Sequence, residues 1–424
     1  MKLSDCAAFV GIDWGDQQHA YCVADAESHD LTHGRLEHET GAIVEWVNKL
    51  RQRFPGKKIA VCLEQRRGPL IYCLMQFDHL LLVPVNPKQL ASFRTAVGAL
   101  EAKDDPTDAG LLTELVRKHG ERLRVWQPED GHIRQLRLLA EYRRHLVDER
   151  TRLTNGLTDT LKQYFPLALE VGGSVLYSNL TYQFLSEYRE LEELQNASDE
   201  ELIDFYRTYK CTRKSVIDER LKKIRNSLPL TTDRAIIDAC VIRTKALVRQ
   251  IQATNLSIAE YESMIATVMS KLPDAEIIES FPGAGAAMAS RILAVMGTDR
   301  SRYSKAADIQ QLSGIAPVVK RSGKFEVVHR RWACNKFVLQ TFHEYAAHSI
   351  KHSVWAKAYY DMSRAQGKKH QAVIRQLAFK WIRIIHACWR NHAKYDELAY
   401  CGSLISRKSP VVKFFADQKN NETP

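Results

Sequence analysis

Four carboxylates occupy positions from which they could hold metal ions. Asp105 and Asp108 are three residues apart, so on a helix they would share one face. Asp13 and Glu64 each end an apolar run that is typical of a strand. Mg²⁺ prefers oxygen ligands, and two such ions about 4 Å apart can clamp the attacking and leaving oxygens of a phosphodiester. The four acids therefore predict a two-ion Mg²⁺ site for phosphodiester chemistry.

The same acids also have a plainer interpretation. Asp105, Pro106 and Asp108 would suit the first turn of a helix, where proline is tolerated and acids complement the helix dipole. Each acid taken alone could be an ordinary surface or strand-end residue. Asp104 competes with Asp105 for one place, although the three-residue spacing to Asp108 favours Asp105.

A serine in a basic segment is a second chemical candidate. Ser322 lies between Arg321 and Lys324, and Arg330 and Arg331 follow closely. A serine hydroxyl that attacks a phosphodiester needs cations of this kind to hold the phosphate and stabilise its charge. We expect a basic loop over Val318–Phe325, in which the serine could also be a simple phosphate contact or turn residue.

Other residues extend a predicted nucleic-acid surface. In Phe281–Gly285, Gly283 and Gly285 could let backbone N–H groups approach a phosphate at a helix start, as in a helix–hairpin–helix turn. A purely structural turn remains an alternative. Lys368 and Lys369 precede a basic helix expected from Ala372 to Trp389. Its two tryptophans, Trp381 and Trp389, are expected in the core.

The elements that must position the acids lie in residues 1–125. Apolar runs and turn signals predict three strands, a helix, a strand, a helix, a strand and a helix, followed by the Asp105/Asp108 helix. This is the ribonuclease-H-like order, in which acids at the ends of the first and fourth strands and on a late helix can converge at one sheet edge. We expect an α/β domain here.

The rest of the chain is expected to be mainly helical. In residues 126–275, long amphipathic patterns over Gly131–Tyr164 and Asp233–Lys271 flank a small helical insert and predict an antiparallel coiled coil for dimerisation or spacing. An ordinary helical bundle is the alternative. Residues 276–403 would form a last, mainly helical domain, and 404–424 a polar tail.

Charge and composition limit the kind of protein. The net charge is +11, yet residues 1–110 carry 12 Lys and Arg against 15 Asp and Glu, whereas residues 281–400 carry 20 against 7. This asymmetry suggests chemistry in the first part and a polyanion held by the last part. Nine cysteines without a CxxC pair indicate reduced thiols, and we expect a cytoplasmic protein without a membrane span or signal peptide.

Motifs at both ends of the chain resemble one family, the DEDD-type insertion-sequence transposases, also called bridge-RNA-guided recombinases. The resemblance covers about residues 8–125 and 276–397, and its order and spacing are more specific than any one motif. The motifs are Val10-Gly11-Ile12-Asp13, Cys62-Leu63-Glu64, Lys103-x-Asp105-x-x-Asp108-Ala109, Pro282-Gly283-x-Gly285, Leu312-x-Gly314-Ile315-Ala316-Pro317, Ser322-Gly323-Lys324, and Gly367-Lys368-x-His370 before a basic helix and Tyr395-Asp396.

The resemblance implies a RuvC-like catalytic domain, a coiled coil and a transposase domain. It implies that Ser322 forms a covalent DNA–serine intermediate beside Mg²⁺ held by the four acids. It further implies donor and target DNA as substrates, a structured bridge RNA that pairs with both, and a dimer or tetramer with composite sites.

Two departures and two rival functions accompany this resemblance. Family members often have Ser-Ser-Gly-Gly where this chain has Arg321-Ser322-Gly323-Lys324, and Asp104 stands where a small hydroxyl residue is usual. The first rival is a RuvC-like endonuclease that uses metal-activated water, with Ser322 only contacting phosphate. The second is a non-catalytic nucleic-acid scaffold, in which the acids only cap and pair.

Overall fold

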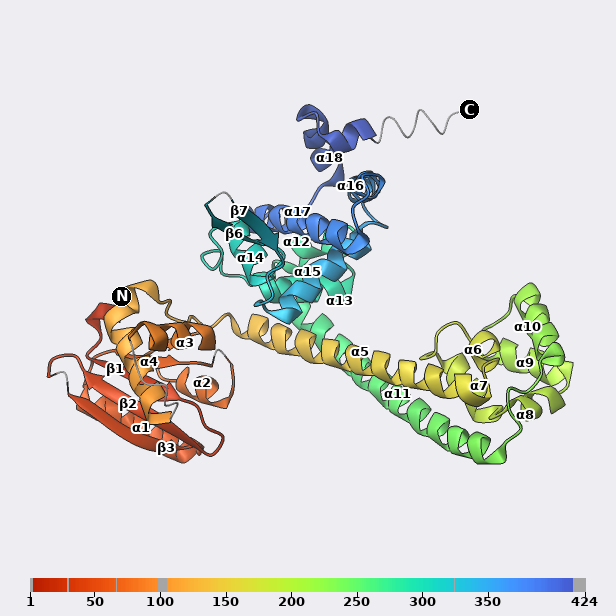
Figure 1. Cartoon of the computed structure of the whole chain (residues 1–424), viewed down its shortest axis with the longest axis horizontal. Helices are drawn as coiled ribbons and strands as arrows, with labels where there is room; N and C mark the ends of the chain where they lie inside the picture. Colours follow the sequence, from red (N-terminus) through yellow and green to blue (C-terminus); the bar gives the residue numbers. More distant parts are fainter. Residues whose placement is uncertain (1–2, 29, 66, 98–104, 324, 415–424) are drawn as a thin grey trace. The chain divides into compact units, whose positions relative to one another are not determined.

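The computed structural model describes residues 3–414 except 29, 66, 98–104 and 324. It divides into two compact units, Met1–Pro128 and Glu129–Pro424. The first unit is a mixed α/β structure and the second is mostly helical (Figure 1). No helix among the described residues is both long and apolar enough to cross a membrane.

A five-stranded sheet forms the centre of the first unit. Its strand order is β3-β2-β1-β4-β5, with β1 parallel to β4, β4 parallel to β5, and β2 antiparallel to both β1 and β3. Four of the five strands are mostly buried between the helical layers, whereas β3 lies at the edge of the sheet and is mostly exposed. The strands are β1 (Ala8–Asp13), β2 (Gln18–Asp25), β3 (Leu31–Glu37), β4 (Ile59–Leu63) and β5 (Leu80–Pro84).

Helices cover both faces of this sheet and create two cores. Val10 and Ile12 of β1 join the core on one face together with Ile43 and Val47 of a helix, whereas Phe9 joins the core on the other face. Side chains alternate along a strand, so Gly11 and Asp13 share the face of Phe9. The helices are α1 (Thr40–Arg53), α2 (Pro69–Leu74), α3 (Pro87–Ala96) and α4 (Asp105–His119), with short 3₁₀ turns at Leu3–Asp5 and Gly120–Arg122.

Gly11 lets helix α4 lie directly on β1. A Cβ atom at Gly11 would collide with the backbone of Ala109 and Thr113, both on α4. The Thr113 hydroxyl instead donates a hydrogen bond to the Cys22 carbonyl of β2 at 2.9 Å. The missing side chain thus fixes how closely α4, and with it the Asp105/Asp108 turn, approaches the sheet.

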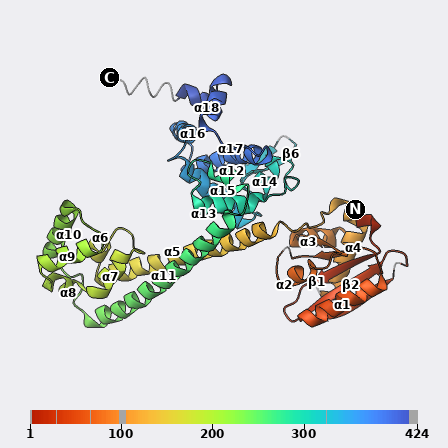
Figure 2. The same ribbon diagram turned by 180° about the vertical axis from the view of Figure 1, so that it is seen from behind.

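Two long helices form the spine of the second unit. Helices α5 (Gly131–Tyr164) and α11 (Arg234–Met269) lie side by side (Figure 1, Figure 2). Arg143 contacts Glu262, and Tyr164 donates a hydrogen bond to Thr244, so early residues of one helix meet late residues of the other. The pair is therefore antiparallel, as the two amphipathic patterns predicted.

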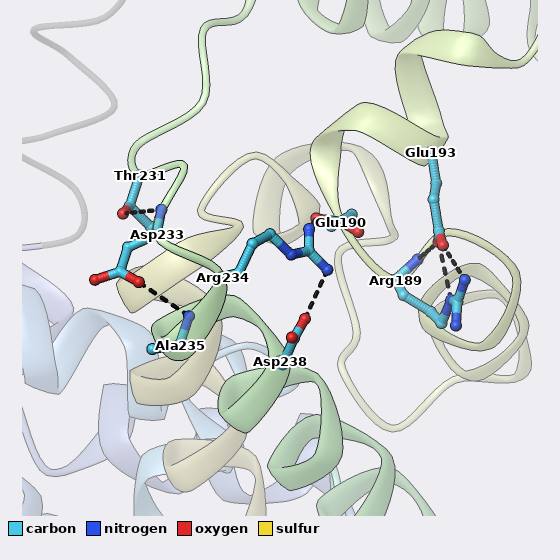
Figure 3. Close-up of polar contacts among 8 residues, drawn as sticks. All are labelled: Arg189, Glu190, Glu193, Thr231, Asp233, Arg234, Ala235 and Asp238. Atoms are coloured by element: carbon cyan, nitrogen blue, oxygen red, sulfur yellow. Dashed lines mark hydrogen bonds and ion pairs between the residues drawn. The ribbon is translucent and has the colours of Figure 1, made fainter.

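A small helical insert joins the end of α5 to the start of α11 and shares one hydrophobic core with both helices. Arg234, the first residue of α11, makes an ion pair with Glu190 of the insert at 2.7 Å. It makes a second ion pair within α11, with Asp238 at 2.6 Å (Figure 3). In the same view, Asp233 caps α11 by accepting from the Ala235 N–H at 2.9 Å. The insert consists of α6 (Ala168–Val171), α7 (Asn179–Glu187), α8 (Leu191–Asn196), α9 (Asp199–Thr208) and α10 (Lys214–Asn226).

The remaining helices pack around a large aromatic core. Trp381 and Trp389 are both fully buried, which confirms their expected place in the core. The helix that carries them begins at His370 and ends at Arg390, slightly longer than the sequence predicted. The elements are α12 (Ala275–Glu279), α13 (Ala286–Met296), α14 (Ala306–Leu312), β6 (Val318–Ser322), β7 (Phe325–His329), α15 (Lys336–Ser349), α16 (Val354–Ala365), α17 (His370–Arg390) and α18 (Glu397–Ser406).

The serine segment differs from its expected form. The sequence predicted a basic loop over Val318–Phe325, but the structure has a two-stranded hairpin in which Ser322 pairs with Phe325. Nearly all side chains of β6 and β7 are exposed. A strand without a buried face lacks the burial pattern by which strands are recognised, and this explains the difference.

Candidate active site

Asp13 and Glu64 leave the sheet at neighbouring positions. Ile12 pairs with Leu63 in the parallel register of β1 and β4, and the next residues are Asp13 and Glu64. Side chains alternate along a strand, so Asp13, the last residue of β1, belongs to the face that carries α4, and Glu64 directly follows the end of β4. Both side chains are half-buried. The register therefore brings two of the predicted acids to one corner of the sheet.

The first turn of α4 lies at the same corner. Ala109 packs against Ala20 and Cys22 of β2, and Ala20 is the register partner of Asp13. Thr113, one turn later, contacts Cys22 and Gly11 instead. Residues nearer the start of α4 therefore lie closer to Asp13. The Asp105/Asp108 turn, at the start of α4, accordingly lies over the end of β1.

Asp108 is buried and paired with a cation, whereas Asp105 is exposed. The side chain of Asp108 is 7% exposed, and it forms an ion pair with the guanidinium of Arg94 on α3. Asp105 is the first residue of α4 and faces solvent. A buried carboxylate needs a partner that offsets its charge, and Arg94 supplies that partner for Asp108. Asp104, the rival of Asp105, lies outside the described residues.

The carboxylates fit a hard divalent ion by their chemistry, although their side chains are not gathered around one point. Among residues 3–414, leaving aside the undescribed positions, no group of three or more His, Cys, Asp or Glu side chains is arranged to hold a metal ion. The backbone positions of the acids lie at one corner of the sheet. Arg94 neutralises Asp108 at this corner. An all-oxygen donor set suits Mg²⁺.

A pair of histidines lies at the same end of β2 but on the other face. His19 accepts a hydrogen bond from the Gly15 N–H at its Nδ1 atom, 3.2 Å away, and its Nε2 atom lies 2.9 Å from Nδ1 of His38. In the neutral tautomer that this implies, Nε2–H of His19 donates to His38. Burial, and then the nearby His38, lower the pKa of His19 to about 4. His19 is therefore neutral near pH 7.

Ser322 lies in the second unit, at the end of β6, and is exposed. Beside it, Arg321 makes an ion pair with Glu326 across the hairpin at 2.9 Å. Lys324 lies outside the described residues. The hairpin thus presents the serine to solvent, with one of its two flanking cations already paired.

The other predicted nucleic-acid residues lie at several places in the second unit. Arg330 is exposed and its guanidinium lies 4.8 Å from the ring centre of Trp332, while Arg331 is half-buried. Lys368 is half-buried, and Lys369 is the exposed N-cap of α17. These residues are basic surface positions, as expected, but they do not form one continuous motif in the sequence.

The Phe281–Gly285 segment forms the turn between α12 and α13. Gly283 has a φ of +76°, a conformation that favours glycine, and its carbonyl lies 2.9 Å from Nδ1 of His348. Gly285 is the N-cap of α13 and has no side-chain cap. The structure has a turn between two helices here, and both the helix–hairpin–helix interpretation and phosphate binding at this turn stay predictions.

Sequence reasoning missed two residues that the structure singles out. Arg94 was not recognised, because a basic residue on a helix surface gives no signal of a carboxylate partner fourteen residues later. Trp332 was also missed, and it is 76% exposed. A lone tryptophan among basic residues, in Arg330-Arg331-Trp332, was the only available signal.

Comparisons with known proteins agree with this arrangement. A family model for transposases of the IS110 DEDD type matches residues 10–166, and a model described as the transposase IS116/IS110/IS902 family matches residues 275–361. The chain is thus a transposase of the DEDD class. It belongs to the IS110/IS116 family.

Three relatives are similar over nearly the whole chain. A Streptomyces coelicolor mini-circle protein, described as a transposase for IS117, is 25% identical over 92% of this chain and 95% of its own length. A 42 kDa protein of insertion element IS900 from Mycobacterium paratuberculosis is 23% identical over 91% and 96%. A 44.8 kDa protein of insertion element IS116 from Streptomyces clavuligerus is 24% identical over 90% and 94%.

Proposed function

We propose that the protein is an RNA-guided DNA transposase that excises and inserts a mobile element by Mg²⁺-assisted attack of Ser322 on DNA phosphodiesters. One observation carries the proposal most: the sheet register and the packing of α4 bring Asp13, Glu64 and the Asp105/Asp108 turn to one corner. The strand order of the first unit, with acids at this corner, supports a ribonuclease-H-like, RuvC-like catalytic domain.

In this proposal, Asp13, Glu64, Asp105 and Asp108 hold the divalent ions. A bound Mg²⁺ pair would neutralise the phosphate and stabilise the charge that develops on its oxygens. The carboxylates themselves orient the ions, and α4 sets their spacing because Gly11 allows it to lie on β1. Arg94 balances the charge of Asp108 within the fold.

Ser322 supplies the nucleophile. Its Oγ would form a bond to phosphorus while a deoxyribose oxygen leaves and takes up a proton, which conserves the phosphodiester for later rejoining. The exposed hairpin makes the hydroxyl accessible, and Arg321, Lys324, Arg330 and Arg331 are basic residues close in sequence that can bind phosphate. Gly283, Gly285, Lys368 and Lys369 are proposed as further phosphate contacts.

The proposed partners are donor and target DNA and a structured bridge RNA. The chain is proposed to act in the cytoplasm as a dimer or tetramer, with the antiparallel α5–α11 pair as spacer or dimerisation element. The three-domain division, at 125/126 and 275/276, likewise stays a proposal beside the two compact units.

A covalent-trapping assay tests the nucleophile. The protein, Mg²⁺, its co-purified RNA and DNA spanning the element end are incubated and run on a denaturing gel. We expect protein-linked DNA from the wild type and none from Ser322→Ala or Asp13→Asn. Cleavage without an adduct, retained in Ser322→Ala, would instead establish a water-using endonuclease.

A separate experiment tests RNA guidance. The protein is purified from its host and the bound RNA is sequenced. We expect one enriched structured RNA encoded beside the element. Random fragments alone would contradict guidance while leaving the DNA chemistry untouched.

A further inference from the structure

A large groove lies in the second unit. It has a volume of about 1300 Å³ and is lined by the loop before β6, the end of β7 and the following loop, and faces of α15 and α17, with Tyr359 of α16. Figure 1 shows these elements together in the second unit. Pockets for small molecules usually measure roughly 300–1,000 Å³, so this groove suits a longer ligand.

The groove is basic, and its one described acid is already engaged. Arg375, Phe379 and Arg383 are spaced four residues apart on α17 and therefore line the groove along one face of that helix. Among the described lining residues, the only carboxylate is Glu344. Glu344 is neutralised inside the fold by Arg291 at 2.5 Å and Arg144 at 3.6 Å.

The groove cations repel one another. Burial, and then the nearby Arg330, lower the pKa of Arg375 from its ordinary value. Burial, and then Arg383, likewise lower the pKa of Lys380. Partly buried like charges are unfavourable unless an anion joins them. Their arrangement therefore fits a ligand that carries several negative charges in a row.

An aromatic side chain lies at the rim of this charged groove. Trp332 lines the groove, is 76% exposed, and has the guanidinium of Arg330 4.8 Å from its ring centre. Exposure on this scale leaves a broad apolar ring face uncovered. Such a ring can stack on a nucleic-acid base, and the adjacent cations can bind the phosphates on either side.

We propose that this groove binds single-stranded DNA, with one unpaired base stacked on Trp332 and the neighbouring phosphates on Arg330, Arg375 and Arg383. A duplex buries the faces of its bases in the helix stack, so it cannot offer one to Trp332. This inference rests on the proposed function in one respect. It assumes that DNA is the substrate and that its two strands are separated during the reaction.

Fluorescence anisotropy of the full chain tests this site. The probe is a fluorescein-labelled oligothymidylate of about 12 nucleotides, within the usual length of one single-strand site. The buffer contains EDTA and the background is Asp13→Asn, so that binding is measured without cleavage. Trp332→Ala should weaken binding roughly 5- to 150-fold, the range expected for loss of one base–aromatic stack. Trp332→Phe should retain most of the affinity.

Tyr142→Ala is the matched control, because Tyr142 is an aromatic residue that is 52% exposed on α5 and does not line the groove. It should bind as the parent does. Equal binding by Trp332→Ala and the parent would overturn the proposal, as would equal or tighter binding of the matched duplex. Tighter, Trp332-dependent binding of oligouridylate would overturn the choice of DNA.

The binding assay for the groove and the trapping assay for Ser322 can fail independently of each other. Trp332-dependent binding without any covalent adduct would leave the groove established and the serine chemistry refuted. An adduct formed normally by Trp332→Ala, together with unchanged oligothymidylate binding, would refute the groove and leave the serine chemistry in place.

Discussion

The carboxylate corner of the first unit carries negative side chains, whereas the groove of the second unit carries mainly positive ones. At the corner, the buried Asp108 is balanced by a single arginine, Arg94. In the groove, Arg375 and Lys380 lie among other cations, and the acid Glu344 is turned to Arg291 and Arg144. We propose small cations as the ligands of the first region and a polyanion as the ligand of the second.

The two regions also differ in the elements that build them. The corner is built on a sheet, where the register places the end of β1 beside the end of β4. The groove is built on helix faces and a hairpin end, which offer area rather than one fixed point. If this contrast is correct, substitutions in the two regions should affect different steps.

The largest expected effect is on cleavage. Asp13→Asn removes a charge from the corner and should slow cleavage of element-end DNA on the order of 10³-fold, because a metal-assisted phosphodiester step loses several kcal/mol of stabilisation. Binding of the same DNA should change little. The measurement is a single-turnover cleavage rate in Mg²⁺, with the exposed Asp16→Asn as the control. A normal rate in Asp13→Asn would remove the corner from the chemistry.

A smaller effect is expected from the glycine beneath α4. Gly11→Ala places a Cβ against the backbone of Ala109 and Thr113, so it should destabilise the protein by about 1–3 kcal/mol, as overpacking generally does. Urea unfolding measures this free energy. Gly41→Ala is the control, since a Cβ there meets nothing within 4 Å and alanine favours the helix. Equal stability of the two variants would contradict the close packing of α4.

A few-fold effect on DNA affinity is expected in the groove. Arg383→Gln removes one exposed cation, and the slope of log affinity against log salt for single-stranded DNA should fall by roughly 0.7. The measurement is the salt dependence of oligothymidylate binding. Lys222→Gln, an exposed cation on α10, should leave the slope unchanged. A slope equally altered by both variants would mean that binding is diffuse.

A further effect is confined to acid solution. Because the pKa of His19 is lowered from 6.5 to about 4, the unfolded chain binds its proton more readily. The contribution of His19 to stability is therefore fully present above pH 6.5 and is lost as pH falls toward 4. His19→Gln should flatten the pH dependence of the free energy of unfolding in this window. An unchanged slope would mean that His19 is not held neutral.

Much of the first unit was predictable because four of its five strands are mostly buried runs with clear ends. The run that ends at Asp13 and the run that ends at Glu64 became β1 and β4 nearly as expected. The helix with Asp105 and Asp108 in its first turn is also present. The sequence pattern gives the order of the elements, and this order indicates the sheet topology. The strand register follows only from that topology.

Other features could not be predicted, because no periodic pattern carries them. The hairpin around Ser322 has no buried face, so its alternation was invisible. The pairing of Arg94 with Asp108 depends on how α3 and α4 pack, and the groove depends on three helices and a loop that are distant in sequence. Such contacts arise from tertiary packing and leave no local signal.

The central claim, that the corner of the sheet is a divalent-cation site, is tested most directly by Mn²⁺ binding. Electron paramagnetic resonance of the full chain with element-end DNA reports free and bound Mn²⁺, with Mn²⁺ standing in for Mg²⁺. We predict bound Mn²⁺ in the wild type and in Asp16→Asn, and affinity lowered by at least about tenfold in Asp13→Asn. Equal Mn²⁺ affinity in the wild type and Asp13→Asn, or no binding at all, would contradict the claim.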